Sequence, residues 1–345
     1  MNAIAEPYRR QSSANRKEYV NQILDLTKHH VLNCDLYRRI CKNLYPRLNV
    51  ARELAEIPPL PTTLFKRALF KSVADDQVFR VFRSSGTSGL QSSVVLDMET
   101  ARLQEQALSA IMKFWLGSTR RPMLLVDSPS VLSGNSARSA AIRGMFKFGR
   151  NHHWLLDEQG NVDRTSLDAW MARVGSKGFF IFGFTFVVWK SLMSEDLNGV
   201  EFSDSILFHG GGWKRLEDSA VSRNDFRSEL QSKLGIGHVK DYYGLVEQLG
   251  NIWVESSPGL FSPSSSSFAL IRDPDTLEVV PDGSPGLIQL FTSIPKSYPG
   301  HSLLTEDIGR IIVNEHRPDL FGNWGLEVLG RLPKTQARGC SDAVV

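Results

Sequence analysis

The segment that decides the fold is Val78-Phe79-Arg80-Val81-Phe82, followed after Arg83 by Ser84-Ser85-Gly86-Thr87-Ser88-Gly89. Its first five residues are mostly β-branched or aromatic, which predicts a strand. A turn of glycines and hydroxyl residues at a strand end can point several backbone N–H groups inward and bind an anionic phosphate. It is not a Walker A loop, because no Gly-Lys-Ser/Thr follows. An ordinary flexible loop is the competing interpretation, since short Ser/Gly runs are common.

On the C-terminal side of this turn, strands and helices are predicted to alternate. Residues 97–116 form an amphipathic pattern with Asp97 as a plausible N-cap. The apolar run at 123–126 is typical of a strand buried on both faces. Strands separated by helix-length segments predict a largely parallel, doubly wound α/β sheet. Further helices are expected at 137–148, 165–174 and 218–234, and further strands at 178–182, 205–208 and 238–242.

The two ends of the chain have sequence patterns that differ from that of the middle. A 3.6-residue apolar period predicts helix over 15–45, and Pro58, Pro59 and Pro61 end this region. After residue 258, Pro-Gly and Asp-Gly turns separate short β-like runs, and the serine run 264–267 is expected to be a loop. The expected division is a helical region at 1–78, an α/β core at 79–257, a β-rich subdomain at 258–331 and a tail at 332–345.

Composition restricts the classes of partner. The 345 residues are 41% hydrophobic and 22% charged, which is the balance of a soluble globular protein. A net charge of +3 gives no indication of a nucleic-acid partner. We expect no signal peptide and no membrane span, and a cytoplasmic location. Cys34, Cys41 and Cys340 have no metal or disulfide spacing.

A second chemical segment is His209-Gly210-Gly211-Gly212-Trp213-Lys214, at the predicted end of an apolar strand. Glycines there allow a flat ring to lie against the backbone, and Lys214 can meet a phosphate or a carboxylate. Open α/β sheets bind ligands at the carboxyl ends of their strands. The alternative interpretation is a tight turn with an exposed lysine.

Two later segments add an aromatic ring and carboxylates. Asp241-Tyr242-Tyr243-Gly244-Leu245-Val246-Glu247-Gln248 places a ring for stacking and a carboxylate for Mg²⁺ within four residues of each other. In Leu303-Leu304-Thr305-Glu306-Asp307-Ile308-Gly309, a carboxylate can hold ribose hydroxyls. Each segment is a weak signal by itself.

In this order, the segments resemble the adenylate-forming superfamily of acyl-CoA synthetases, firefly luciferase and peptide-synthetase adenylation domains. The resemblance spans about residues 79–331 and implies layered parallel sheets with a small β-rich subdomain. It also implies ATP and Mg²⁺ as cofactors. The residues implied for ATP or AMP binding are Ser84, Ser85, Gly86, Thr87, Ser88, Gly89, Gly211, Gly212, Tyr243, Gly244, Asp307 and Arg331, and the metal ligand is Glu247.

Three departures from that superfamily matter. Ser92 stands where a Lys or Arg usually follows the phosphate loop, and Val246 replaces the usual threonine before the glutamate. The sequence ends 14 residues after Arg331, so the usual C-terminal lid domain is not expected. Without the lid, a full acyl-CoA synthetase cycle is not implied.

A narrower resemblance accounts for these departures. Gly-Gly-Trp-Lys, Tyr-Gly-Leu-Val-Glu-Gln and the ending from Gly330-Arg331 to Ala337-Arg338-Gly339-Cys340-Ser341 are similar to the acyl-protein synthetases of bacterial fatty acid reductase complexes. The resemblance implies activation of a carboxylic acid, expected to be a fatty acid, as acyl-AMP and transfer of the acyl group to Cys340. A partner acyl reductase then receives it. Arg338 should favour the thiolate of Cys340.

Other features have structural interpretations that we favour. The aromatic cluster Phe179, Phe180, Phe182, Phe184, Phe186 and Trp189 is either core or the lining of an acyl tunnel. His152, His153 and His209 are expected to be structural histidines, and Cys34 and Cys41 to be buried thiols.

Two functional alternatives stay open. The acyl acceptor can instead be coenzyme A, a carrier-protein thiol or a small amine. The chain can also be a degenerate, non-catalytic adenylation domain that serves as a binding subunit.

Overall fold

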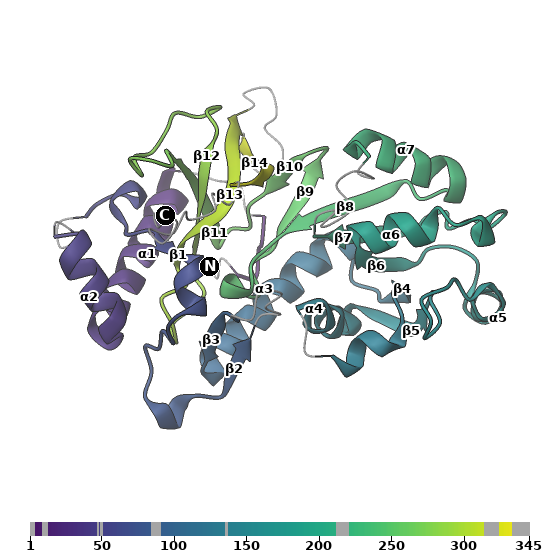
Figure 1. Ribbon diagram of the computed structural model, residues 1–345, viewed down its shortest axis with the longest axis horizontal. Helices are drawn as coiled ribbons and strands as arrows, with labels where there is room; N and C mark the ends of the chain where they lie inside the picture. Colours follow the sequence, from purple (N-terminus) through teal and green to yellow (C-terminus); the bar gives the residue numbers. More distant parts are fainter. Residues whose placement is uncertain are drawn as a thin grey trace, which may run out of the picture.

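A twelve-stranded mixed sheet runs through the molecule in the computed structural model (Figure 1). The structure describes residues 4–8, 13–46, 48, 51–83, 91–134, 137–211, 221–313 and 324–332. The strand order is β11-β12-β13-β14-β10-β9-β8-β7-β6-β4-β5, with β1 beside β13. In the ribbon, the sheet extends from the antiparallel strands next to the N-terminal helices to the α/β end that carries α5.

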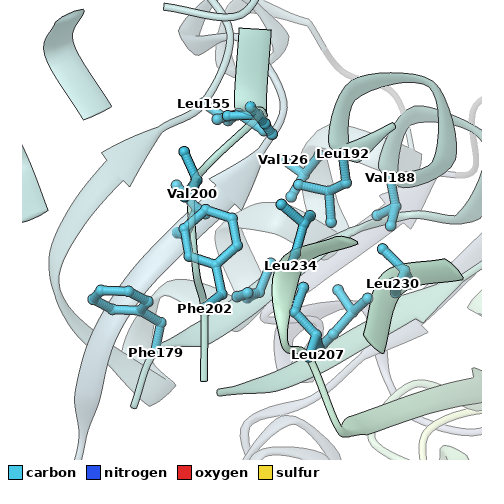
Figure 2. Close-up of a cluster of buried hydrophobic side chains, with 14 of the residues drawn as sticks. Val126, Leu155, Phe179, Val188, Leu192, Val200, Phe202, Leu207, Leu230 and Leu234 are labelled. Atoms are coloured by element: carbon cyan, nitrogen blue, oxygen red, sulfur yellow. The ribbon is translucent and has the colours of Figure 1, made fainter. Parts of the chain in front are cut away.

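One half of this sheet is parallel and doubly wound, as predicted. Neighbouring side chains on each strand enter opposite cores: Leu124 packs with α5, α6 and α7, whereas Leu125 packs with α3 and α4. Figure 2 shows the first of these clusters, which includes Leu207 and Leu230. The elements of this half are β4 (Arg121–Val126), β5 (Gly149–Trp154), β6 (Phe180–Phe184), β7 (Ile206–Gly210), β8 (His238–Tyr243), α3 (Met98–Leu116), α4 (Ala137–Met145), α5 (Arg164–Val174), α6 (Thr185–Leu192) and α7 (Arg223–Leu234).

The other half is antiparallel and continues the same sheet. The expectation of layered parallel sheets is corrected here, because the β-rich subdomain extends the same sheet: β9 pairs antiparallel with β8 at Tyr242 and Tyr243. The connection 244–252, which contains a 3₁₀ helix, reverses the chain, so the next strand pairs along the β8 edge instead of starting a new layer. Its strands are β9 (Trp253–Ser257), β10 (Leu260–Ser262), β11 (Ser267–Arg272), β12 (Gly286–Thr292), β13 (Ser302–Val313) and β14 (Trp324–Arg331).

The N-terminal region packs on the antiparallel half. Two helices, α1 (Ser13–Asn33) and α2 (Asp35–Leu44), confirm the predicted helical pattern. The proline segment holds a short strand, β1 (Leu60–Pro61), which pairs in parallel with β13. On α1, Tyr19 lies 6.4 Å from Phe268 of β11, measured between ring centroids. This contact joins the first helix to the far end of the sheet.

Short elements complete the described part of the chain. Strands β2 (Arg80–Arg83) and β3 (Ser93–Leu96), which precede and follow the Ser/Gly segment in the sequence, form a separate antiparallel pair. Short 3₁₀ helices are η2 (Leu54–Glu56), η3 (Thr62–Lys66), η4 (Asp75–Gln77), η5 (Pro129–Ser133), η6 (Phe146–Phe148), η7 (Glu195–Leu197) and η9 (Val246–Gln248). None of the described helices is long and apolar enough to cross a membrane.

Candidate active site

Three of the residues predicted to bind the nucleotide meet at the boundary between the two halves of the sheet. Tyr243 is the last residue of β8, and its hydroxyl donates a hydrogen bond of 2.8 Å to Oδ2 of Asp307 on β13. Arg331 pairs with Asp307 in the β13–β14 register, and its Nε lies 3.5 Å from Asp307 Oδ1. The fold therefore assembles side chains that are up to 88 positions apart in the sequence, from Tyr243 to Arg331.

The electrostatics of this trio keep Tyr243 as a hydrogen-bond donor. Burial raises the pKa of Tyr243 well above its usual value, and the neighbouring Asp307 carboxylate raises that pKa further. The phenol therefore stays protonated at neutral pH and can hold the carboxylate in one orientation. Arg331 has a side chain that is 62% exposed, so we assign its ion pair with Asp307 little energy.

The end of β7 has a packing and a backbone conformation that favour glycine. A Cβ at Gly210 would lie 2.6 Å from a ring carbon of Tyr242, so only glycine fits there. Gly211 has φ of +76°, a conformation that favours glycine. Gly244 follows β8 directly, within a turn beside Asn251 and Ile252. Gly212 and Lys214 lie outside the described residues.

A buried polar network lies on the opposite face of these strand ends. His209 Nδ1 lies 3.0 Å from the Thr185 hydroxyl, and burial, with help from nearby arginines, lowers the pKa of His209 to about 3. Burial also raises the pKa of Asp241 to about 7, although Arg223, 3.2 Å away, opposes this shift. His209 is thus a neutral, hydrogen-bonded histidine, which agrees with the structural interpretation. Its neighbour Asp241 links β8 to the first turn of α7.

Glu247 lies in η9, directly after the β8 strand end. Its residue is 7% exposed, and its backbone carbonyl accepts a hydrogen bond from Tyr298. Among the described residues, no hydrogen bond or ion pair engages its carboxylate, and no group of three His, Cys, Asp or Glu side chains forms a metal site. A single free carboxylate still fits Mg²⁺, since this ion is usually held by one or two carboxylates together with substrate phosphates and waters.

Several predicted site residues fall outside the described part of the chain. They are Ser84, Ser85, Gly86, Thr87, Ser88, Gly89, Gly212, Lys214 and Cys340. Ser92, which borders the first group, is 1% exposed.

The aromatic cluster and the two early cysteines are mainly structural. Phe179, Phe180 and Phe182 are at most 1% exposed and belong to the two cores of the parallel half. Cys34 and Cys41 are free, buried thiols, as predicted. His152 makes a backbone contact with Phe146, whereas His153 stacks on Trp170.

The residues that hold Glu247 were missed in the sequence. Tyr298 contacts its backbone from 51 positions away, and Gln104 of α3 donates to the Tyr298 hydroxyl from 194 positions away. No local pattern marks such contacts.

Comparisons with known protein sequences point to one family. The model of the family "Acyl-protein synthetase, LuxE" matches residues 4–345. A long-chain-fatty-acid–luciferin-component ligase of Vibrio harveyi is 27% identical over 329 residues, which cover 91% of this chain and 84% of that protein. The ligase of the same name from Aliivibrio fischeri is 25% identical over 314 residues, with 88% and 82% covered.

Solved structures show the same fold at low sequence identity. An open conformation of 2-hydroxyisobutyryl-CoA ligase, in complex with 2-HIB-AMP and CoA, superimposes with a TM-score of 0.70 at 14% identity, covering 95% of this chain and 77% of that one. ATP-bound MatB of Rhodopseudomonas palustris gives a TM-score of 0.51 at 17% identity, with 75% and 49% covered. The fold is therefore that of adenylate-forming ligases. Since the family model also spans almost the whole sequence, this chain belongs to the LuxE family of acyl-protein synthetases.

Proposed function

We propose that this chain uses ATP to activate a fatty acid as its acyl-adenylate and then transfers the acyl group to the thiol of Cys340. The observation that carries the proposal is the contact between Tyr243, Asp307 and Arg331. From three different strands, these side chains bring together an aromatic ring, a carboxylate for the ribose and a cation. The named relatives are fatty-acid ligases, which supports a long-chain acid as the substrate.

In the first half-reaction, the carboxylate oxygen of the acid attacks the α-phosphorus of ATP. The bond from that phosphorus to the bridging oxygen breaks, and pyrophosphate leaves. The backbone N–H groups of residues 84–89 bind the phosphates, and Lys214 stabilises the developing negative charge. Glu247 would hold Mg²⁺, which neutralises phosphate charge when it is bound.

In the second half-reaction, the thiolate of Cys340 attacks the acyl carbonyl. The carbon–oxygen bond to AMP breaks, so AMP leaves and a thioester remains. Arg338, two positions away in the sequence, favours the thiolate. Cys34 and Cys41 are buried in the N-terminal helical region, where no acyl-adenylate can reach them.

The acyl group then passes to a partner protein. The relatives are named for a luciferin component, which supports a protein of an aldehyde-forming or luminescence system as the acceptor. An acyl reductase fits this chemistry, because a thioester is reduced more readily than a free acid. Coenzyme A or a carrier-protein thiol is the competing acceptor.

Acid-dependent ATP–pyrophosphate exchange tests the adenylation step. We expect exchange with long-chain fatty acids and none without acid. The Asp307→Ala variant should lose most of the exchange, while the exposed Asp76→Ala control should keep it. If no acid in a panel of chain lengths supports exchange, the chain is a non-catalytic member of its family.

A further inference from the structure

Two buried polar side chains hold the backbone that carries Glu247, one from outside η9 and one within it. Tyr298 is fully buried, and its hydroxyl donates a 2.9 Å hydrogen bond to the carbonyl oxygen of Glu247. The amide of Gln104, on α3, donates in turn to the Tyr298 hydroxyl at 3.4 Å. The Glu247 carbonyl oxygen and the Tyr298 hydroxyl oxygen therefore each accept a hydrogen bond. The Glu247 carbonyl is fixed relative to α3, which lies on the sheet.

The second clamp is Gln248, the residue after Glu247. It is 2% exposed, and its amide nitrogen donates to the carbonyl of Leu290 on β12 at 3.2 Å and to that of Gly300 at 2.9 Å. Its amide oxygen accepts a 3.3 Å hydrogen bond from Asn251. A buried amide that makes three hydrogen bonds is well satisfied. Gln248 thus ties η9 to the antiparallel half of the sheet.

Close packing leaves η9 little freedom to move. A Cβ at Gly300 would lie 2.8 Å from the Glu247 carbonyl oxygen, closer than real side chains approach. Leu245, Val246 and Leu249, on both sides of Glu247, pack into the core cluster that contains Tyr298 and Phe65. All these anchors act on the main chain of Glu247 or on the side chains of its neighbours in the sequence. No hydrogen bond or ion pair joins these anchors to its carboxylate, although burial, and with it the charge of that carboxylate, raises the pKa of Tyr298.

We infer that Tyr298 and Gln248 are positioning residues that preorganise the Glu247 carboxylate for the metal–nucleotide complex. This inference rests on the proposed function, in which Glu247 binds Mg²⁺. A carboxylate held in place before binding loses less conformational freedom when the metal arrives. A buried side chain that neutralised Glu247 would compete with the metal, whereas an anchor on the backbone does not.

The test is the gain in ATP affinity that Mg²⁺ provides, measured by calorimetry without fatty acid. ATP is titrated into the full chain in excess Mg²⁺ and again in EDTA, and the ratio of the two dissociation constants is the readout. Tyr298→Phe removes only the hydroxyl and should reduce this ratio about three- to tenfold, the equivalent of one hydrogen bond. The affinity in EDTA should stay unchanged. If Tyr298 only stabilised the fold, Tyr298→Phe would change the ATP affinity equally in excess Mg²⁺ and in EDTA.

Tyr37→Phe is the matched control, because Tyr37 is also fully buried in the same core cluster but lies on α2. It should leave the ratio as in the wild type. Glu247→Gln tests the underlying assignment and should bring the ratio close to one. If Glu247→Gln does so while Tyr298→Phe behaves like Tyr37→Phe, the positioning role of Tyr298 is refuted. If Glu247→Gln keeps the wild-type ratio, the metal assignment in the proposed function fails, and the positioning role fails with it.

Discussion

At the scale of single residues, Asp307 lies between two partners, the phenol of Tyr243 and the guanidinium of Arg331. A Tyr-Gly-x-x-Glu segment predicts a stacking ring. The structure adds a hydrogen bond from the phenol to the Asp307 carboxylate. Lys214 and Cys340 stay predictions, because they lie outside the described residues. Tyr298 could not be predicted, since its hydroxyl meets Glu247 only after the sheet has formed.

The Tyr243–Asp307 contact leads to a prediction about nucleotide binding. Tyr243→Phe keeps the ring for stacking but releases the Asp307 carboxylate, so the affinity for ATP should fall by about tenfold, as for the loss of a charged hydrogen bond. Equilibrium dialysis with labelled ATP measures this change. Tyr37→Phe serves again as the buried control. An unchanged ATP affinity in Tyr243→Phe would mean that Asp307 does not contact the nucleotide through this arrangement.

At the scale of elements, the strands with continuous apolar runs in the parallel half were predicted, whereas the edge strand β5 was missed. β4 and β6 are buried on both faces, and their sequences show it. β5 is an edge strand with the sequence Gly-Arg-Asn-His-His-Trp, whose exposed side chains give no apolar pattern. The serine run 264–267 was expected to be a simple loop. Residues 263–266 do form the connection between β10 and β11, but Ser264, Ser266 and Ser267 are buried, and Ser264 and Ser267 hydrogen bond to Asn251.

The predicted N-cap of α3 is confirmed and can be tested by stability. The Asp97 carboxylate accepts a 2.7 Å hydrogen bond from the backbone N–H of Thr100. Asp97→Ala should therefore lower the free energy of unfolding by about 1 kcal/mol. Chemical denaturation measures this value. The exposed Asp76→Ala variant should change it by less than about 0.5 kcal/mol. Equal effects of the two substitutions would show that the cap contributes nothing.

At the scale of the whole molecule, buried histidines join the N-terminal helices to the antiparallel half of the sheet. His30 of α1 stacks on His301 with ring centroids 4.8 Å apart, and both residues are fully buried. His301 Nε2 lies 2.9 Å from the Thr27 hydroxyl, and His30 Nδ1 lies 2.8 Å from the Ser72 hydroxyl. Sequence periodicity predicted the helices but not this attachment, which depends on residues about 270 positions apart, such as Thr27 and His301.

This attachment predicts a stability that depends on acid. Burial lowers the pKa of His301 to about 3, whereas an unfolded histidine titrates near pH ~6.5. Between these values the unfolded chain binds a proton that the folded chain does not, so stability falls as the pH decreases from about 6.5 towards 3. Denaturation at a series of pH values should show a shallower slope for His301→Gln than for the wild type. The slope should not vanish, because His30 and His209 are also buried and neutral.

The exposed His152→Gln variant is the control for this series. Its slope should match that of the wild type. If His301→Gln has the wild-type slope as well, then the stacked histidine pair is not what makes the fold sensitive to acid.

The most direct test of the account is covalent acylation by labelled fatty acid and ATP, followed by mass spectrometry of the intact chain and its peptides. We predict one acyl group on Cys340 of the wild type. Cys340→Ala should carry no label while it still catalyses acid-dependent ATP–pyrophosphate exchange. Cys34→Ala and Cys41→Ala, which remove buried thiols, should be labelled like the wild type. A Cys340→Ala protein that is still acylated at another residue would contradict the account.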